Sequence, residues 1–165
     1  MSYFMVDIEA DGPIPGDFSM IALGAVVVEP GLKKRFYAEL RPISDRFDPE
    51  ALAVGGFTRK QTLAFEDAGQ VVKRFVEFVG SSTAGRPVFI SDNNGFDWMF
   101  VCWYLWHFAG ENPFGHSSQN LGSLYKGFVK DMKPTFKHLR MSAHTHNALD
   151  DAVGNAEALL KIRDQ

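Results

Sequence analysis

Two acidic residues two positions apart, Asp7 and Glu9, carry the first chemical signal of the sequence. The segment 3–9 around them reads as a β-strand, because apolar residues alternate with the others at Phe4, Val6 and Ile8. Side chains in a strand repeat every two residues, so both carboxylates are expected on one face. Adjacent carboxylates on an apolar strand repel each other, and such oxygen ligands suit Mg²⁺ or Mn²⁺. This pair is therefore a candidate metal site, although two acids at this spacing are by themselves a weak signal.

A third carboxylate, Asp97, follows the predicted strand 86–91. Open α/β sheets place their ligands at the carboxyl ends of strands, which favours a functional interpretation of Asp97. The alternative is an acidic residue in the first turn of a helix, where the helix macrodipole favours it.

A histidine and a fourth carboxylate, His146 and Asp151, lie at the start of the last predicted helix. Asn147 is expected to cap this helix, and capping is the alternative role for its acids, although it suits Asp150 better than Asp151. His146 lies in a loop, where it is either a solvated residue or a mobile general base that reaches a water beside a metal.

The length and composition indicate a single globular domain. The 165 residues fit one domain, 1–165, and the 45% apolar content is ordinary for a globular protein. The formal charge of −3 argues against a uniformly basic protein but leaves room for a local basic face. Cys102 is the only cysteine, which excludes an internal disulfide and agrees with an expected cytoplasmic location. We expect no signal peptide, membrane span or membrane partner.

The order of predicted elements favours a mixed α/β sheet. Segments 20–29 and 34–40 read as strands joined by short turns to the first strand, which predicts an antiparallel three-strand meander. The strand 86–91 then pairs in parallel through a helical crossover. The other expected elements are a short helix in 49–62, helices 66–79 and 96–108, a loop 112–120, a helical piece 124–129 and a small-residue helix 148–162.

Taken together, these segments resemble the DEDDh exonucleases of the ribonuclease H-like superfamily. That group includes DNA-polymerase proofreading subunits, ribonuclease T and oligoribonuclease. The match occurs in order and covers nearly the whole chain, in Val6–Gly12 with Ile21–Val26, Val54–Thr58, Asn93–Phe100 and His146–Ala152. Each piece is weak alone, but the joint pattern is specific.

The resemblance implies a five-stranded mixed sheet flanked by helices and a 3′–5′ exonuclease that releases nucleoside 5′-monophosphates. Two divalent ions, Mg²⁺ or Mn²⁺, would clamp the attacking and leaving oxygens at phosphorus. Their expected ligands are Asp7, Glu9, Asp97 and Asp151, with His146 as general base. The expected partners are the 3′ ends of single-stranded RNA or DNA, and RNA is slightly favoured because small stand-alone members include exoribonucleases.

Three alternatives stay open at this point. They are a DNA-directed proofreading or repair exonuclease, a catalytically silent RNA-binding module, and a phosphohydrolase of small phosphate esters. A homodimer is compatible with the resemblance. The chain also departs from the family pattern at Ala10, Asp11 and Asp92, and the two extra acids are expected to add negative charge to the site.

Substrate contacts are expected from three places. Gly12, Ile14 and Phe18 lie in the loop after the acidic pair, and Asn93 and Trp98 flank Asp97. A basic stretch containing Lys137 precedes His146 and is expected to bind phosphates, with a solvated helix face as the alternative. The stretch comprises Lys126, Lys130, Lys133, Lys137, His138 and Arg140. Most aromatic residues of 96–108 are expected in the core or at a dimer contact. Trp98 is the exception, where the alternative is stacking on a base.

Overall fold

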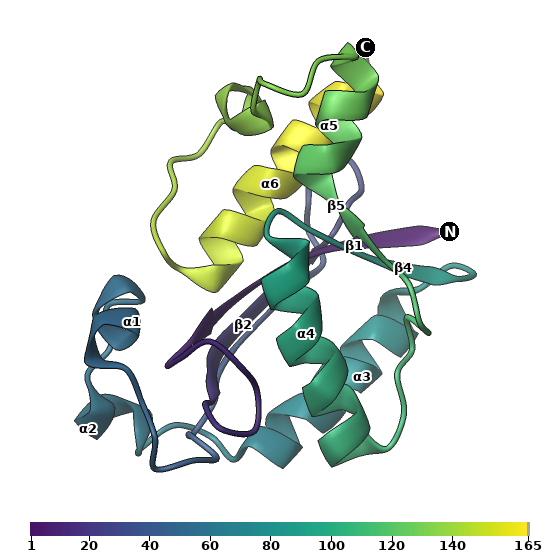
Figure 1. The fold of residues 1–165 in the computed structure, drawn as a ribbon. Coiled ribbons are helices and arrows are strands. Elements are labelled where there is room, and N and C mark those ends of the chain that lie inside the picture. The colour runs from purple at the N-terminus through teal and green to yellow at the C-terminus, as the bar shows by residue number, and fades with distance from the viewer. Residues whose placement is uncertain (165) are drawn as a thin grey trace.

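The computed structural model describes residues 1–164 and contains one five-stranded sheet with strand order β3-β2-β1-β4-β5 (Figure 1). β1 pairs antiparallel with β2, β2 antiparallel with β3, and β1 parallel with β4, which confirms the predicted meander and crossover. The strands are β1 Ser2–Ala10, β2 Met20–Val27, β3 Arg35–Glu39, β4 Pro87–Ser91 and β5 Ser118–Asn120.

Helices cover both faces of this sheet (Figure 1). α3 and α4 pack on one face, and α6 crosses β1 and β2 on the other with α5 beside it. Within residues 1–164, no helix has the length and apolar character needed to span a membrane. The helices are α1 Pro49–Val54, α2 Arg59–Thr62, α3 Ala68–Ser82, α4 Asn94–Tyr104, α5 Leu121–Val129 and α6 Ala148–Arg163.

Three predicted elements differ from the structure. The segment 112–120, expected as a loop, ends in the short strand β5, which pairs in parallel with β4 from Ser118 to Asn120. The helix expected over 96–108 ends at Tyr104 and continues as a π-helical turn, Leu105–Ala109. A second helix, α2, follows the loop at Gly55–Gly56 because Thr58 and Gln61 form a capping box.

The central strand β1 separates two apolar layers. Phe4, Val6 and Ile8 are buried against α3 and α4, whereas Met5 is buried against α5 and α6. Asp7 and Glu9 share the parity of Met5, so the strand directs both carboxylates toward the α6 layer. The alternation that predicts a strand therefore also determines which helix meets the acids.

A glycine in β2 lets α6 approach the sheet closely. Gly24 pairs with Asp7 across the β1–β2 ladder. A methyl group built on Gly24 would overlap the backbone of Ala148 and Leu149 at the start of α6. Ala148 and Ala152 are fully buried at this contact, as expected for a helix of small residues packed against a sheet. This approach brings the first turn of α6 to the carboxylates.

The extra acid Asp11 does not crowd the metal-site carboxylates, contrary to expectation. Its side chain is fully buried, and its two oxygens accept hydrogen bonds from the Ser19 amide at 2.5 Å and the Arg59 guanidinium at 3.0 Å. Arg59 also donates to the Ser44 carbonyl. Asp11 thus ties the loop after β1 to α2 and to the segment before α1.

We expect Arg59→Ala to lower the free energy of unfolding by about 3 kcal/mol, because it leaves the buried Asp11 carboxylate without its charged partner. Urea denaturation measures the change. The matched control is Arg41→Ala, since Arg41 and Asp67 are both about half exposed and such pairs contribute at most about 1 kcal/mol. Equal losses in the two variants would contradict this role of Asp11.

Candidate active site

Three carboxylates from two elements converge at the end of β1. Asp7 and Glu9 come from β1 and Asp151 from the first turn of α6. Each offers an oxygen, and these atoms all lie within 4.8 Å of one another. Asp151 is 1% exposed, whereas Asp7 and Glu9 are only partly buried. An all-carboxylate donor set of this kind matches the chemistry of Mg²⁺ and Mn²⁺.

Asp97 borders this trio without belonging to the 4.8 Å set. It lies in the first turn of α4, just past the end of β4, and is 2% exposed. Burial raises its pKa to about 7, although hydrogen bonds from the Ser91 side chain and the Ile8 amide act in the opposite direction. Its Oδ2 atom is buried without a hydrogen-bond partner. A buried carboxylate oxygen of this kind is suited to bind a cation.

The pKa values of the two β1 carboxyl groups, Asp7 and Glu9, are raised, as expected where several negative charges lie close together. Burial, followed by repulsion from Asp97 and Glu9, raises the pKa of Asp7 well above its usual value. Burial and the charges of Asp151 and Asp97 raise the pKa of Glu9 to about 7. Asp92 adds to the repulsion at Asp7 and Asp97, as expected for this second extra acid. A divalent ion would offset the repulsion.

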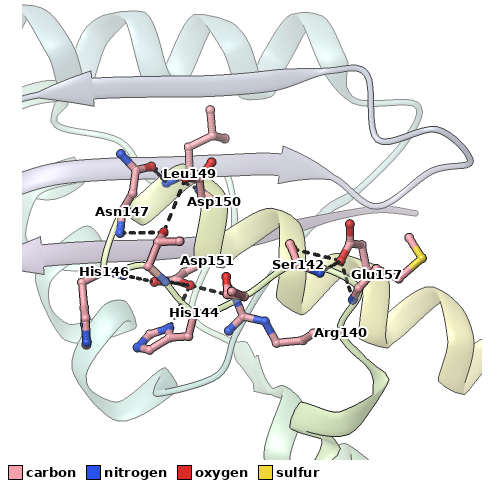
Figure 2. Close-up of polar contacts among 12 residues, drawn as sticks. Arg140, Ser142, His144, His146, Asn147, Leu149, Asp150, Asp151 and Glu157 are labelled. Carbon is pink, nitrogen blue, oxygen red and sulfur yellow. Dashed lines mark hydrogen bonds and ion pairs between the residues drawn. The ribbon is translucent and has the colours of Figure 1, made fainter.

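Asp151 behaves in the opposite way because donors surround it (Figure 2). Its Oδ1 accepts hydrogen bonds from Arg140 at 2.7 Å, from His144 at 2.8 Å and from the Thr145 amide at 3.2 Å. Burial raises the pKa of Asp151, but these donors outweigh burial and hold it below the usual value. Asp151 is therefore ionised in the metal-free protein.

His146 lies at the rim of the carboxylate cluster. Its backbone amide donates to Asp151 Oδ2 at 2.9 Å, and its side chain is exposed. Its φ of 56° is unusual for a residue other than glycine, and it holds the turn just before the Asn147 cap. The predicted cap is confirmed, since Asn147 accepts from the amides of Leu149 and Asp150.

Sequence reasoning missed His144 and the buried position of Arg140. The ring of His144 lies 4.3 Å, between centroids, from that of His146 and bonds to Asp151. The only signal for His144 was its position close before His146. Arg140 was expected to bind phosphates with the basic stretch, but its side chain is 6% exposed and pairs with Asp151. Burial excludes it from the expected phosphate-binding stretch.

The structure places the expected substrate residues in different surroundings. Gly12 is buried and lies against the ring of Phe18, which a methyl group on Gly12 would overlap. Ile14 is 46% exposed at the tip of the same loop. Trp98 packs 4.9 Å from Phe89, between ring centroids, and also lines an open groove with Trp103 and Trp106.

The two remaining expected contacts lie on the surface. Asn93 precedes α4 and is exposed. Lys137 is exposed and lines a cavity of about 230 Å³ together with Lys126 and Asp92. Because Asp92 acts electrostatically on Asp7 and Asp97, this cavity adjoins the carboxylate cluster.

In the metal-free protein, the free energy of unfolding is expected to fall as the pH rises from 5 to 8. The folded-state pKa values of Glu9 and Asp97 are about 7, so the native state holds protons that the unfolded chain releases near pH 4. The stability linked to Asp151 has the opposite sign but changes near and below pH 4, outside this window.

Urea denaturation in EDTA at pH 5 and pH 8 measures this fall. Millimolar Mg²⁺ should reduce or reverse it, because metal binds the deprotonated carboxylates and stabilises only the folded state. Rising stability between pH 5 and pH 8 in EDTA would contradict the repulsive cluster.

The chain is similar in sequence to a known exonuclease. The 3′-5′ DNA exonuclease Cap18 of Escherichia coli is 36% identical over 129 residues, which cover 76% of this chain and 68% of that protein. No family model matches the chain.

Solved structures share the fold at low sequence identity. Cell-death related nuclease 4 (CRN-4) aligns with a TM-score of 0.78 at 15% identity, over 99% of this chain and 64% of that one. A full-length 3′-exonuclease aligns with a TM-score of 0.79 at 17% identity, over 99% and 60% of the two chains. Exonuclease I of E. coli, in complex with a dA16 oligonucleotide, gives 0.75 at 16% identity, over 98% and 40%. The chain thus spans less than two thirds of each of these structures.

The 36% sequence identity to Cap18 shows that the two proteins are related. The mixed five-stranded sheet is the fold expected for such a relative. The chain belongs to the 3′–5′ exonucleases of the DEDDh type, which have a ribonuclease H-like fold.

Proposed function

We propose that this chain removes nucleotides one at a time from the 3′ end of single-stranded DNA in a metal-dependent reaction. The observation that carries the proposal is the convergence of Asp7, Glu9 and Asp151 within 4.8 Å. The unpartnered Oδ2 of Asp97 beside them supports it. DNA replaces the RNA preference expected from the sequence, because the relative at 36% identity is called a DNA exonuclease.

The four carboxylates would hold two divalent ions, Mg²⁺ or Mn²⁺. Bound ions of this kind polarise a phosphodiester and lower the pKa of an attacking water. Water forms the new bond to phosphorus, and the bond from phosphorus to the O3′ atom of the preceding nucleotide breaks. The O3′ oxygen takes up a proton from solvent to become a 3′-hydroxyl, and a nucleoside 5′-monophosphate leaves. His146 accepts the proton of the water, because it is exposed at the rim and its own amide is anchored to Asp151.

Two features support a single-stranded substrate beside this site. Ile14 is exposed on the loop that directly follows the acidic pair, so it can contact a terminal base. Lys137 and Lys126 line the cavity next to Asp92, where they can bind backbone phosphates. Asn93 and Trp98 remain expected contacts on the α4 side.

The test is a time course on single-stranded DNA and RNA of equal sequence, each labelled at the 5′ end, with Mg²⁺ or Mn²⁺. We expect a ladder that shortens from the 3′ end, faster on DNA. His146→Gln should slow it by about 10²- to 10⁴-fold, as for loss of a general base, while oligonucleotide binding persists.

The alternatives give different outcomes in the same assay. Faster shortening of RNA would overturn the DNA assignment. Binding without cleavage would indicate a silent binding module. Hydrolysis of a small phosphodiester such as bis(p-nitrophenyl) phosphate, with both oligonucleotides intact, would indicate a phosphohydrolase of small esters.

A further inference from the structure

One arginine, Arg140, is enclosed beside a carboxylate of the active site. Its Nη2 atom lies 2.7 Å from Asp151 Oδ1 and 3.3 Å from the Ala143 carbonyl oxygen. The side chains of Arg140 and Asp151 are 6% and 1% exposed, so neither charge is satisfied mainly by water. A buried pair of this kind leaves a strongly unfavourable charge when one partner is removed.

The helix α6 provides the space for this guanidinium. A methyl group built on Gly154 would overlap the Nε, Cζ and Nη2 atoms of Arg140. Gly154 lies in the interior of α6, where alanine is otherwise preferred by about 1 kcal/mol. The glycine thus makes room for Arg140 at a position where the helix alone would favour a side chain.

The same carboxylate also holds the loop that carries His146. Asp151 accepts hydrogen bonds from the amides of Thr145 and His146 and from the ring of His144 (Figure 2). The other end of this loop is fixed separately, because Glu157 accepts from the amides of Met141 and Ser142. The loop 140–147 is therefore tied to α6 at both of its ends, by Asp151 at the site and by Glu157 away from it.

We infer that Arg140 is a positioning residue for the reaction. It holds the Asp151 carboxylate oriented toward Asp7 and Glu9, and through Asp151 it sets the loop that carries His146. Three donors, including Arg140, occupy Oδ1, whereas Oδ2 has one donor, the His146 amide, so Oδ2 is the oxygen that would be left to bind a metal. This inference rests on the proposed metal-dependent function.

The burial of Arg140 favours the positioning role over phosphate binding. A phosphate-binding arginine presents its guanidinium to solvent, as the exposed Lys137 does with its ammonium group. The Arg140 guanidinium instead has its charge paired inside the protein. Its loss should act on metal binding and on the loop, and should leave oligonucleotide affinity little changed.

The experiment measures Mn²⁺ affinity by titration calorimetry on the folded protein, with hydrogen exchange of peptides covering 143–147 as a second readout. Arg140→Ala should weaken Mn²⁺ binding by about 10- to 100-fold, the usual effect of removing a group that orients a metal ligand. Exchange at the Thr145 and His146 amides should accelerate. Arg140→Lys keeps the charge with a shorter reach and should recover part of the affinity.

Gly154→Ala provides an independent route, because it displaces the guanidinium without removing it. It should weaken Mn²⁺ binding in the same direction as Arg140→Ala. Gly80→Ala is the matched control, since Gly80 lies in the interior of α3 with nothing near an added methyl group. Glu157→Ala frees the other end of the loop and should leave Mn²⁺ affinity within about twofold of the unsubstituted protein, because Glu157 lies outside the metal site.

The outcomes distinguish this inference from the proposed function. If the unsubstituted protein does not bind Mn²⁺, the proposed metal site fails. If it binds and both Arg140→Ala and Gly154→Ala bind equally well while still folded, Arg140 has no positioning role. A loss of oligonucleotide affinity in Ca²⁺ with unchanged Mn²⁺ affinity would assign Arg140 to phosphate binding instead. If Arg140→Ala does not fold, Arg140→Lys and Gly154→Ala decide the question.

Discussion

Asp7→Asn is expected to lower exonuclease turnover by on the order of 10³-fold while raising the stability of the metal-free protein. Asp7 is the carboxylate on which the most negative charges act, because Asp97, Glu9, Asp151 and Asp92 all raise its pKa in addition to burial. A neutral amide of equal size removes this repulsion and should raise the free energy of unfolding in EDTA at pH 8 by about 1 kcal/mol or more. It also removes a proposed metal ligand, so stabilisation by Mg²⁺ should largely disappear.

Asp11→Asn is the matched control, since it makes the same chemical change four positions along the chain. Burial raises the pKa of Asp11, but its carboxylate pairs with Arg59, and an amide would leave that largely buried guanidinium without its charged partner. Asp11→Asn should therefore destabilise the protein and leave stabilisation by Mg²⁺ intact. Urea denaturation with EDTA or Mg²⁺ measures both effects. If both substitutions changed the free energy of unfolding with the same sign, repulsion of the Asp7 carboxylate by its acidic neighbours would not be a distinct destabilising effect.

The parts of the site that follow from local pattern were predictable from the sequence. The alternation around Asp7 and Glu9 predicts their common face, and the Asn147 cap predicts where α6 begins. Both depend only on neighbours within a few residues, which is the range of strand and capping rules. The segments around Asp97 and Asp151 follow this pair in the order that the family resemblance requires, so the other two carboxylates of the site were predictable as well.

The parts set by tertiary contacts were not predictable. Arg140 reads as one more cation in a basic stretch, and only the packing of the loop on α6 reveals its pairing with Asp151. Asp11 reads as a further site acid because its partner Arg59 lies 48 residues away. The strand β5 has the sequence Ser-Gln-Asn, which lacks β-branched or aromatic residues, so its pairing with β4 decides its conformation.

Gly24→Ala is expected to lower exonuclease activity by about 10²-fold, although Gly24 contributes no functional group. An added methyl group would overlap the backbone of Ala148 and Leu149, which cannot rotate away as the end of a side chain can. The start of α6 must therefore move from β2, and Asp151 lies within three residues of the contact. Displacement of one carboxylate by about 1 Å is enough for a loss of this size.

The cost in stability should be smaller, about 1 to 3 kcal/mol, as for other cases of overpacking. Urea denaturation and initial rates on single-stranded DNA measure the two effects separately. Gly127→Ala is the control, because Gly127 lies within α5 with open space around an added methyl group, so stability should rise slightly with unchanged activity. If Gly24→Ala lost stability but kept full activity and Mn²⁺ affinity, the close approach of α6 would serve packing alone, and the carboxylates would tolerate a shift of the helix that carries Asp151.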